Sequence, residues 1–209
     1  GIKMDTDEQI LDFLSTKENL SFAFEISEQL QQLKKRLHKK FWEDVECQFR
    51  DKAMEIEGFY DDWKIKYDAS QVENKWHSIS ISPKKNSPLY LSVVIEQVST
   101  LSQVEIGYRW SEEVNENMSF DEVDLLRDYV ENVANKISSL KSNNSWIGWF
   151  YTPWALQSKE FCLQYVENPD VIMQQTVEIA WQFFDEQKEH IISLNNSVAN
   201  AIANGERLY

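Results

Sequence analysis

The residues best suited to chemistry lie in the segment VENKWHSISI, residues 72–81, where Glu73 and Lys75 precede alternating apolar residues. Many metal-dependent nucleases present a catalytic carboxylate and a lysine as Glu-x-Lys, with an upstream aspartate as a second ligand of a divalent ion. Asp62 stands about a dozen residues upstream of Glu73. One hypothesis is therefore a nuclease site in which Asp62 and Glu73 bind Mg²⁺ and Lys75 lies near the attacking water.

The alternative is that Glu73 and Lys75 are solvated charges at the start of an ordinary strand. In these nucleases the Glu-x-Lys pair lies on a buried, nearly continuous apolar strand, which positions the metal rigidly. Here the preceding residues 68–71 form a polar, turn-like run, Asp-Ala-Ser-Gln. A three-residue pattern is also frequent by chance in a chain with 27% charged residues. We favour the solvated charges, and therefore expect no catalytic residue and no cofactor.

The histidines and cysteines show no metal-ligand spacing. His38, His77 and His190 are far apart in the sequence, and no His-Glu-x-x-His pattern is present. Cys47 and Cys162 are isolated thiols in segments of apolar pattern. We expect both to be buried free thiols, which is typical of a cytoplasmic protein.

Two groups of lysines are candidate binding residues. Lys34, Lys35 and Lys39 belong to a basic island in an otherwise acidic chain, and Lys84 and Lys85 form a second one in a turn. These side chains could contact phosphates or an acidic partner. The alternative, which we favour, is a solvated helix face whose lysines pair with nearby carboxylates.

The aromatic segment WIGWFYTPWAL, residues 146–156, supplies two further candidates, Trp149 and Trp154. Exposed tryptophans could form a stacking platform or a protein-interaction patch. In a strand the side chains alternate between two faces, so at least one face of this segment is expected to pack in the core. Packing against the final helix is the interpretation we favour.

Composition restricts the class of protein. The 209 residues include 42% hydrophobic residues, which is typical of a globular chain, and residues 1–209 are expected to form one domain. No apolar run approaches the roughly 20 residues of a membrane span. The net charge of −14 repels nucleic-acid phosphates and argues against direct nucleic-acid binding by this chain alone.

Hydrophobic periodicity predicts an α+β fold. Apolar residues at steps of three and four predict N-terminal helices within residues 7–57, with one long helix over 19–57 that ends at Gly58. Period-two alternation predicts antiparallel strands over 63–110. Farther along, a helix is expected over 119–140, aromatic strands over 146–166 and a long helix over 169–203.

These elements predict an antiparallel meander sheet of about four to five strands. The sheet is expected to pack against two long helices that lie side by side, together with one or two shorter helices. Because a helix of some 38 residues exceeds what one small sheet can cover, self-association through the long helices is also expected.

The segments NLSFAFEISEQLQQLKKRLHKKFWEDVE, LSVVIEQ, VEIGYRW and WIGWFY occur in this order between residues 19 and 155. This arrangement resembles the C-terminal accessory region of bacterial PD-(D/E)XK nuclease-superfamily proteins found near defence systems. In those proteins the catalytic residues belong to a preceding core, so the resemblance implies a non-catalytic region and transfers no functional residue.

Three functions follow from the sequence. The leading one is a non-catalytic interaction or regulatory domain that binds a protein partner or another copy of itself. The second is an acidic inhibitor that imitates the charge of DNA, based on the net charge and on the carboxylates within residues 111–122. The third is the nuclease that uses Asp62, Glu73 and Lys75.

Overall fold

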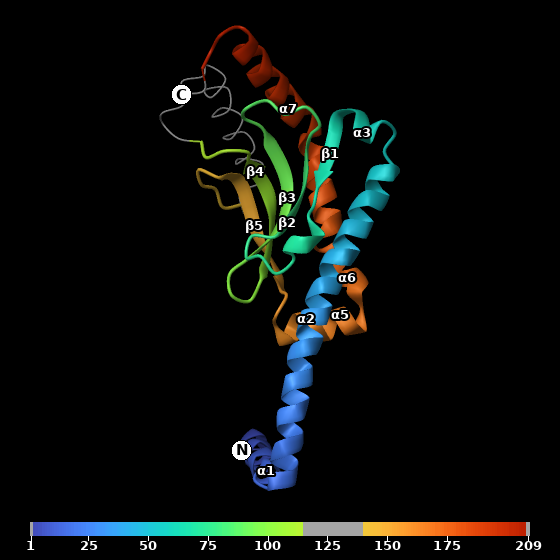
Figure 1. Cartoon of the computed structure of the whole chain (residues 1–209), viewed down its shortest axis with the longest axis vertical. Helices are drawn as coiled ribbons and strands as arrows, with labels where there is room; N and C mark the ends of the chain where they lie inside the picture. The colour runs from blue at the N-terminus through green and yellow to red at the C-terminus, as the bar shows by residue number, and fades with distance from the viewer. Residues whose placement is uncertain (1, 115–139, 208–209) are drawn as a thin grey trace.

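The fold is α+β and is built on a five-stranded antiparallel meander, as the sequence predicts. The computed structural model describes residues 2–114 and 140–207. Each strand pairs with its neighbour in chain order (Figure 1). The strands are β1 (Trp63–Lys66), β2 (Ser78–Pro83), β3 (Leu91–Val98), β4 (Gln103–Trp110) and β5 (Trp146–Ala155).

One face of the sheet is covered by α7 (Val177–Ala203). Phe184 meets Trp63 of β1 with ring centroids 4.8 Å apart, and Phe183 stacks on Tyr108 of β4 at 5.1 Å. The Tyr108 hydroxyl also donates a hydrogen bond to the carbonyl of Phe183, at 2.9 Å. Aromatic contacts of this kind fix how the helix crosses the strands, because rings prefer edge-to-face or offset stacked arrangements.

The second long helix, α2 (Lys17–Met54), lies beside α7 in the body of the protein. Phe49 of α2 and Trp181 of α7 have ring centroids 5.6 Å apart, and both side chains belong to the buried core. The prediction that the two long helices lie side by side is therefore confirmed. Only the second half of α2 takes part, since its buried residues begin at Leu37.

The N-terminal helices begin and end at other residues than predicted. The first helix, α1, spans Ile2–Leu14 and so begins before the expected residue 7. Thr16 caps α2 by accepting a hydrogen bond from the backbone N–H of Asn19, at 3.3 Å. The helix ends at Met54, and Gly58, with φ of 72°, instead starts the short helix α3 (Phe59–Asp62). A left-handed φ suits glycine because it has no Cβ.

The strand expected around residues 161–165 is wrong. The segment forms α5 (Lys159–Glu167), whose N-cap Ser158 accepts from the N–H of Phe161 at 3.1 Å. Phe161 and Tyr165, one helical turn apart, are buried, whereas Leu163 is exposed. The same three residues satisfy a two-residue alternation, which is why the pattern alone misled.

The helix expected over 169–203 is interrupted. It divides into α6 (Pro169–Gln174) and α7, with the break at Gln175 and Thr176. The buried Thr176 leaves helical geometry, and its hydroxyl donates to the carbonyl of Ile172 at 2.7 Å. This bond satisfies a carbonyl that the broken helix would otherwise leave without a partner.

Two other expectations concern the thiols and the middle helix. Cys47 and Cys162 are free, as predicted, but Cys47 is exposed and Cys162 half-buried, so the expected burial of both is wrong. Cys47 lies on the solvent side of α2 because the apolar stripe contains its neighbours Val45 and Phe49. The helix expected over 119–140 falls almost entirely on residues 115–139, outside the described residues.

Candidate functional site

A buried polar network joins α2 to the sheet. The side-chain oxygen of Gln97, at the end of β3, accepts hydrogen bonds from Trp42 Nε1 and from His38 Nε2, each at 2.7 Å. All three side chains are buried, and Trp42 is fully inaccessible to solvent. We call His38, Trp42 and Gln97 the α2 pin, because they fix the rotation and height of α2 against β3.

Other segments complete the hydrogen bonding of the pin. The Gln97 amide donates to the carbonyls of Val72 and Asn74, at 2.7 and 2.6 Å. Gln157 donates to His38 Nδ1 at 2.7 Å, while His38 Nε2 donates to Gln97. This arrangement requires neutral His38 with its proton on Nε2. Burial accordingly lowers the pKa of His38.

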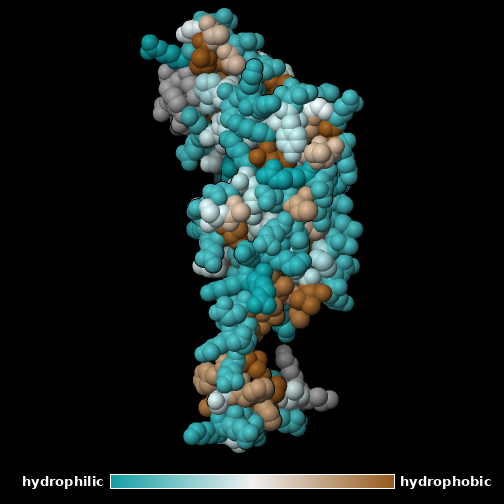
Figure 2. All heavy atoms as spheres, turned by 45° about the vertical axis from the view of Figure 1, so that its right-hand side comes forward, coloured by the Kyte–Doolittle hydropathy of each residue, from teal (hydrophilic) through white to brown (hydrophobic). Residues whose placement is uncertain are grey.

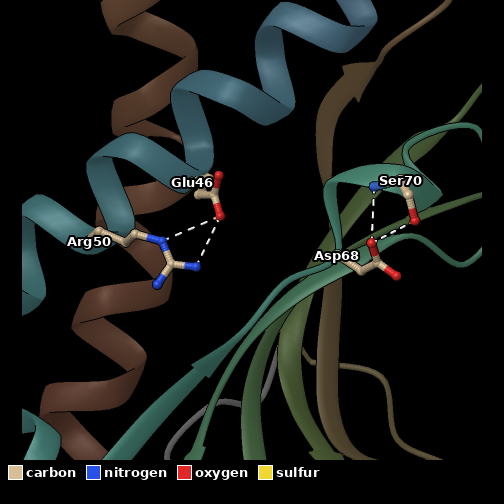
Figure 3. A network of polar contacts seen from close by, with 4 residues as sticks. All are labelled: Glu46, Arg50, Asp68 and Ser70. Atoms are coloured by element: carbon tan, nitrogen blue, oxygen red, sulfur yellow. Dashed lines mark hydrogen bonds and ion pairs between the residues drawn. The ribbon is translucent and has the colours of Figure 1, made fainter.

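A groove of about 1000 Å³ opens beside the pin, between α2, the 3₁₀ turn η1 (Ala69–Gln71) and the β3–β4 turn. Its wall at η1 is formed by a capped turn. The Asp68 carboxylate accepts from the N–H of Ser70 at 3.0 Å and from its hydroxyl at 2.7 Å (Figure 3). Figure 3 also shows the neighbouring Glu46–Arg50 ion pair on α2, at 3.0 Å.

The structure brings three of the predicted lysines to this groove. Lys34, Lys35 and Lys39 line it together with Arg36, so the basic island of the sequence is one wall of a real depression. Lys39 lies 3.9 Å from Glu43, but no ion pair joins Lys34, Lys35 or Arg36 to any residue in the described ranges. The groove therefore presents positive charge in a chain whose net charge is −14.

The first half of α2 and all of α1 project from the body as a helical hairpin (Figure 1). We call residues 2–36 the arm. Its α1–α2 corner is fixed by Thr16 and by Asn19, whose side chain donates to the carbonyl of Phe13 at 2.7 Å. At a rise of 1.5 Å per residue, the projecting part of α2, residues 17–36, extends roughly 30 Å.

The arm exposes nine large apolar side chains, each at least 43% accessible. Figure 2 shows apolar side chains gathered at the lower end of the molecule, where the arm projects. Monomeric proteins seldom leave so many neighbouring apolar side chains in water, and such surfaces mark interaction sites. The nine are Ile10, Leu11, Phe13, Leu20, Phe22, Phe24, Ile26, Leu30 and Leu33.

A second depression, of about 590 Å³, lies over β3, β4 and β5. Glu96 and Glu105 stand directly opposite each other in the β3–β4 pairing, and both are buried. Arg109 forms an ion pair with Glu96. Burial and the neighbouring Glu96 charge raise the pKa of Glu105 to about 7, and burial raises the pKa of Glu96. Burial and the proximity of the two carboxyl groups thus both favour the protonated form of Glu105, beside the ion-paired Glu96.

Aromatic side chains surround these carboxyl groups, but cations of the same chain already cover several rings. Trp76, Trp146, Trp149 and Tyr151 line the depression. The guanidinium of Arg109 lies 5.6 Å from the ring centre of Trp146, the Lys75 ammonium 4.6 Å from that of Trp76, and the Lys141 ammonium 4.8 Å from that of Tyr151. Trp149 is half-buried, and its ring centre lies 6.3 Å from that of Trp146 with the two planes tilted by 47°.

The residues of the nuclease hypothesis lie in separate places. Asp62 ends α3, and its carbonyl accepts from the N–H of Lys84 just beyond the end of β2. Glu73 lines the basic groove and Lys75 lines the aromatic depression, before the other end of β2. The six residues of β2 separate the two ends by roughly 17 Å, whereas ligands of one magnesium ion lie about 2 Å from it. Within the described ranges, no group of three or more His, Cys, Asp or Glu residues could hold a metal ion.

The remaining predicted binding residues also lie apart. Lys84 donates to the carbonyl of Tyr60 at 2.8 Å, and the Lys85 carbonyl accepts from Asn195 of α7. Trp154 donates through Nε1 to Gln175 at 2.8 Å, so its polar edge is occupied by the α6–α7 junction. These three side chains form no common surface with the basic groove.

Carboxylates in the second half of α2 do not form the rows that a DNA mimic needs. Glu43, Asp44 and Glu46 each pair with a basic residue four positions away, at 3.9, 3.3 and 3.0 Å. Such alternation of sign lowers the local negative potential. Of the acidic segment 111–122, Glu112 and Glu113 are exposed and residues 115–122 lie outside the described residues.

Sequence reasoning missed the α2 pin and the carboxylate pair. The pin joins residues separated by 55 and 59 positions, and nothing in the local pattern connects them. The carboxylate pair had a signal, because Glu96 and Glu105 flank a short turn between two apolar strands. Placing them opposite each other requires the hairpin register, which depends on the turn type.

Comparison with known proteins adds no family to this description. No protein-family model matches the chain, and neither a curated protein nor a solved structure is significantly similar to it. In the part of the chain that the structure describes, no helix has the length and apolar character to cross a membrane.

Proposed function

We propose that this protein is a non-catalytic interaction module whose recognition element is the arm. The single observation that carries the proposal is the continuity of α2. One apolar stripe runs from Phe41 and Leu37, buried in the core, to Leu33, Leu30 and Ile26, which are 43–53% exposed. A helix keeps such a stripe beyond its own domain where another protein surface covers it.

The construction of the body supports this function. The α2 pin fixes the helix against β3 through buried hydrogen bonds, so the arm leaves the body in one direction. Recognition by a pre-positioned helix needs little ordering on binding, which lowers the entropic cost of association. The proposed partner contact is therefore a helix-in-groove or helix-bundle contact through regularly spaced apolar side chains.

A relation to the accessory regions of nuclease-superfamily proteins, which only the arrangement of sequence segments suggests, stays a prediction. A cytoplasmic location is likewise proposed, on the basis of the two free thiols. The nuclease and DNA-mimic hypotheses are not favoured, given the separation of Asp62 from Glu73 and the ion-paired carboxylates of α2.

A photo-crosslinking experiment tests the proposed function. A photoreactive amino acid is placed at Phe22 or Ile26 on the arm, and at the control position Leu163, which is 61% exposed on the body. The full chain is then irradiated in the cells from which it comes. We expect protein adducts at the two arm positions and none above background at Leu163. Equal labelling of all three positions, or none at the arm, would refute the proposal.

A further inference from the structure

We infer that the depression over β3, β4 and β5 binds an alkylguanidinium group, such as an arginine side chain, with Glu105 as its counter-charge. The depression lies on the sheet and not on the arm, so this inference goes beyond the proposed function and does not depend on it. Three observations carry it: the position of Glu105, the way in which the chain holds its own Arg109, and the aromatic rings beside both.

Glu105 is buried in the depression without a basic partner. Its neighbours in β4, Val104 and Ile106, belong to the core, so strand alternation directs Glu105 to the opposite face of the sheet. The side chain is 5% exposed and lines the depression. Its carboxyl group interacts with that of Glu96, whereas the nearby Arg109 is paired with Glu96. A buried carboxylate without a counter-charge is costly, so the site favours a ligand that supplies a positive charge.

Arg109 shows how this surface holds a cation. Its guanidinium forms an ion pair with Glu96 and lies 5.6 Å from the ring centre of Trp146. A carboxylate together with an aromatic face stabilises a guanidinium, which is planar and more weakly hydrated than an ammonium. The chain therefore already binds one arginine side chain in the depression.

The same kinds of side chain surround Glu105. Tyr151 stands directly opposite Glu105 in the β4–β5 pairing, and Trp149 stands opposite Gly107, the next residue of β4 on the same face. Both rings line the depression. Among the described residues, no cation lies over the ring of Trp149. A carboxyl group and an aromatic face thus lie together, as they do at Arg109, but the described chain provides no guanidinium for them.

Two lysines near the depression do not supply this charge. Lys75 lies over the ring of Trp76, at 4.6 Å, and Lys141 over the ring of Tyr151, at 4.8 Å. Both rings are exposed. In the described ranges neither ammonium forms an ion pair with Glu105. The lysines therefore lie at the solvent-facing rim, and the buried carboxyl group keeps no basic partner.

The protonation of Glu105 reports this lack of a counter-charge. Burial and the neighbouring charge of Glu96 outweigh the attraction of Arg109 and raise the pKa of Glu105 to about 7. A bound guanidinium would favour the ionised carboxylate, so binding would release the proton. In the described ranges, the charged and titratable groups around the depression are Glu96, Glu105, Arg109, Lys75, Lys141 and Tyr151.

An organic cation suits the depression better than a metal ion. Mg²⁺ and Ca²⁺ take about six to eight oxygen ligands. Among the described lining residues only Glu96 and Glu105 carry carboxyl groups, and Arg109 is already bound to the first. The volume of about 590 Å³ lies in the range of small-molecule sites, and aromatic walls bind organic cations rather than hydrated metal ions.

Isothermal titration calorimetry of the purified full chain with N-acetyl-arginine amide tests the inference. We expect a Kd of about 0.1–1 mM at pH 8, as is usual for a ligand of this size. Binding should be about 10-fold weaker at pH 6, because only about a tenth of the Glu105 side chains are then ionised, while the guanidinium stays charged. In two buffers of different ionisation enthalpy, binding at pH 6 should release about one proton, and binding at pH 8 almost none.

Variants isolate the counter-charge. Glu105→Gln keeps the shape of the protonated carboxyl group, so it should fold, and it should bind N-acetyl-arginine amide at least about 10-fold more weakly at pH 8, with no proton released. Tyr151→Leu should weaken binding several-fold by removing an aromatic face. The matched control Glu160→Gln changes an exposed carboxylate of α5 and should bind as the wild-type chain does.

A second pair of probes identifies the source of the cation. A peptide with one arginine between alanines should bind more tightly than N-acetyl-arginine amide if the natural ligand is a protein segment, and equally if it is a small molecule. Either result supports the guanidinium site.

Three results would overturn the inference. The first is equal binding of the neutral isostere N-acetyl-citrulline amide, and the second is an affinity for the arginine probe that does not rise with pH or survives Glu105→Gln. The third is the absence of binding by either arginine probe at millimolar concentration and pH 8.

Discussion

Replacing Gln97 with methionine tests whether the α2 pin holds the helix on the sheet. Methionine matches the length of glutamine but neither donates nor accepts the required hydrogen bonds. Four bonds of 2.6–2.7 Å are lost, two of them to the buried side chains of His38 and Trp42. Each buried bond contributes about 1 kcal/mol net, and leaving a buried donor without a partner costs more.

The expected loss of stability in Gln97→Met depends on how deeply each of the four hydrogen bonds is buried. Val72 is half-buried and Asn74 is exposed, so water can replace the hydrogen bonds to their carbonyls, and the loss of these two bonds costs less. The indole N–H of Trp42 is inaccessible to water, and its loss is fully felt. We expect Gln97→Met to lower the free energy of unfolding by about 3 kcal/mol, which corresponds to a fall in Tm of roughly 6–12 °C for a chain of this size.

Urea unfolding followed by tryptophan fluorescence, at equal protein concentration, measures the effect. Gln103→Met is the matched control. The Gln103 amide donates two hydrogen bonds, to the carbonyls of Thr152 and Trp154, but the side chain is only half-buried. This variant should lose about 1 kcal/mol or less. A loss in Gln97→Met no larger than that of the control would refute the pin as the element that fixes α2.

Further predictions concern the body and the arm. Because the pKa of Glu105 is raised to about 7, the folded protein binds that proton more tightly than the unfolded chain, and stability falls as the pH rises from the ordinary glutamate pKa through about 7. Glu105→Gln should reduce this pH-dependent change in stability by about 1–2 kcal/mol, measured by urea titrations at several pH values. Burial lowers the pKa of His77 to about 4, so His77→Phe should remove the opposite slope, a loss of stability as the pH falls from 6.5 toward 4. Leu37→Glu should destabilise the body by about 3 kcal/mol or more by burying a carboxylate, whereas Leu33→Glu should leave the stability of a monomeric background unchanged; equal losses would contradict the assigned boundary between body and arm. Gly107→Ala should cost roughly 2 kcal/mol in the same assay, since its Cβ would meet the facing backbone of β5.

The elements with a clear hydrophobic period were predictable from sequence. Ile26, Leu33, Phe41 and Val45 repeat at helical steps, and they do lie on one helix. The period does not show where the body ends, because Ile26 and Phe41 have the same local pattern. The difference comes from tertiary packing: Phe161 and Tyr165 of α5 contact the Phe41 ring, at 5.7 and 6.4 Å, whereas Ile26 is exposed.

Local signals also failed where two structures satisfy the same pattern. Phe161 and Tyr165 fit a strand as well as one face of a helix, and the N-cap Ser158 decided in favour of the helix. No glycine or proline lies at the break around Thr176, so the sequence gives no local signal for it. The groove could not be predicted from sequence. Its lysines are close together in the chain, but its other walls, η1 and the β3–β4 turn, are distant from them in sequence.

The continuity of α2 ties the facing of the arm to the number of residues in the helix. Each residue turns an α-helix by about 100°. One residue inserted between Leu33 and Leu37 would leave the body intact and rotate the exposed apolar stripe of the arm by that angle around the helix axis. Four inserted residues would return it to within about 40° of its original facing. The number of residues in α2 thus sets the direction in which the arm presents its apolar side chains. Insertions could change that direction without altering any of the side chains that make contact.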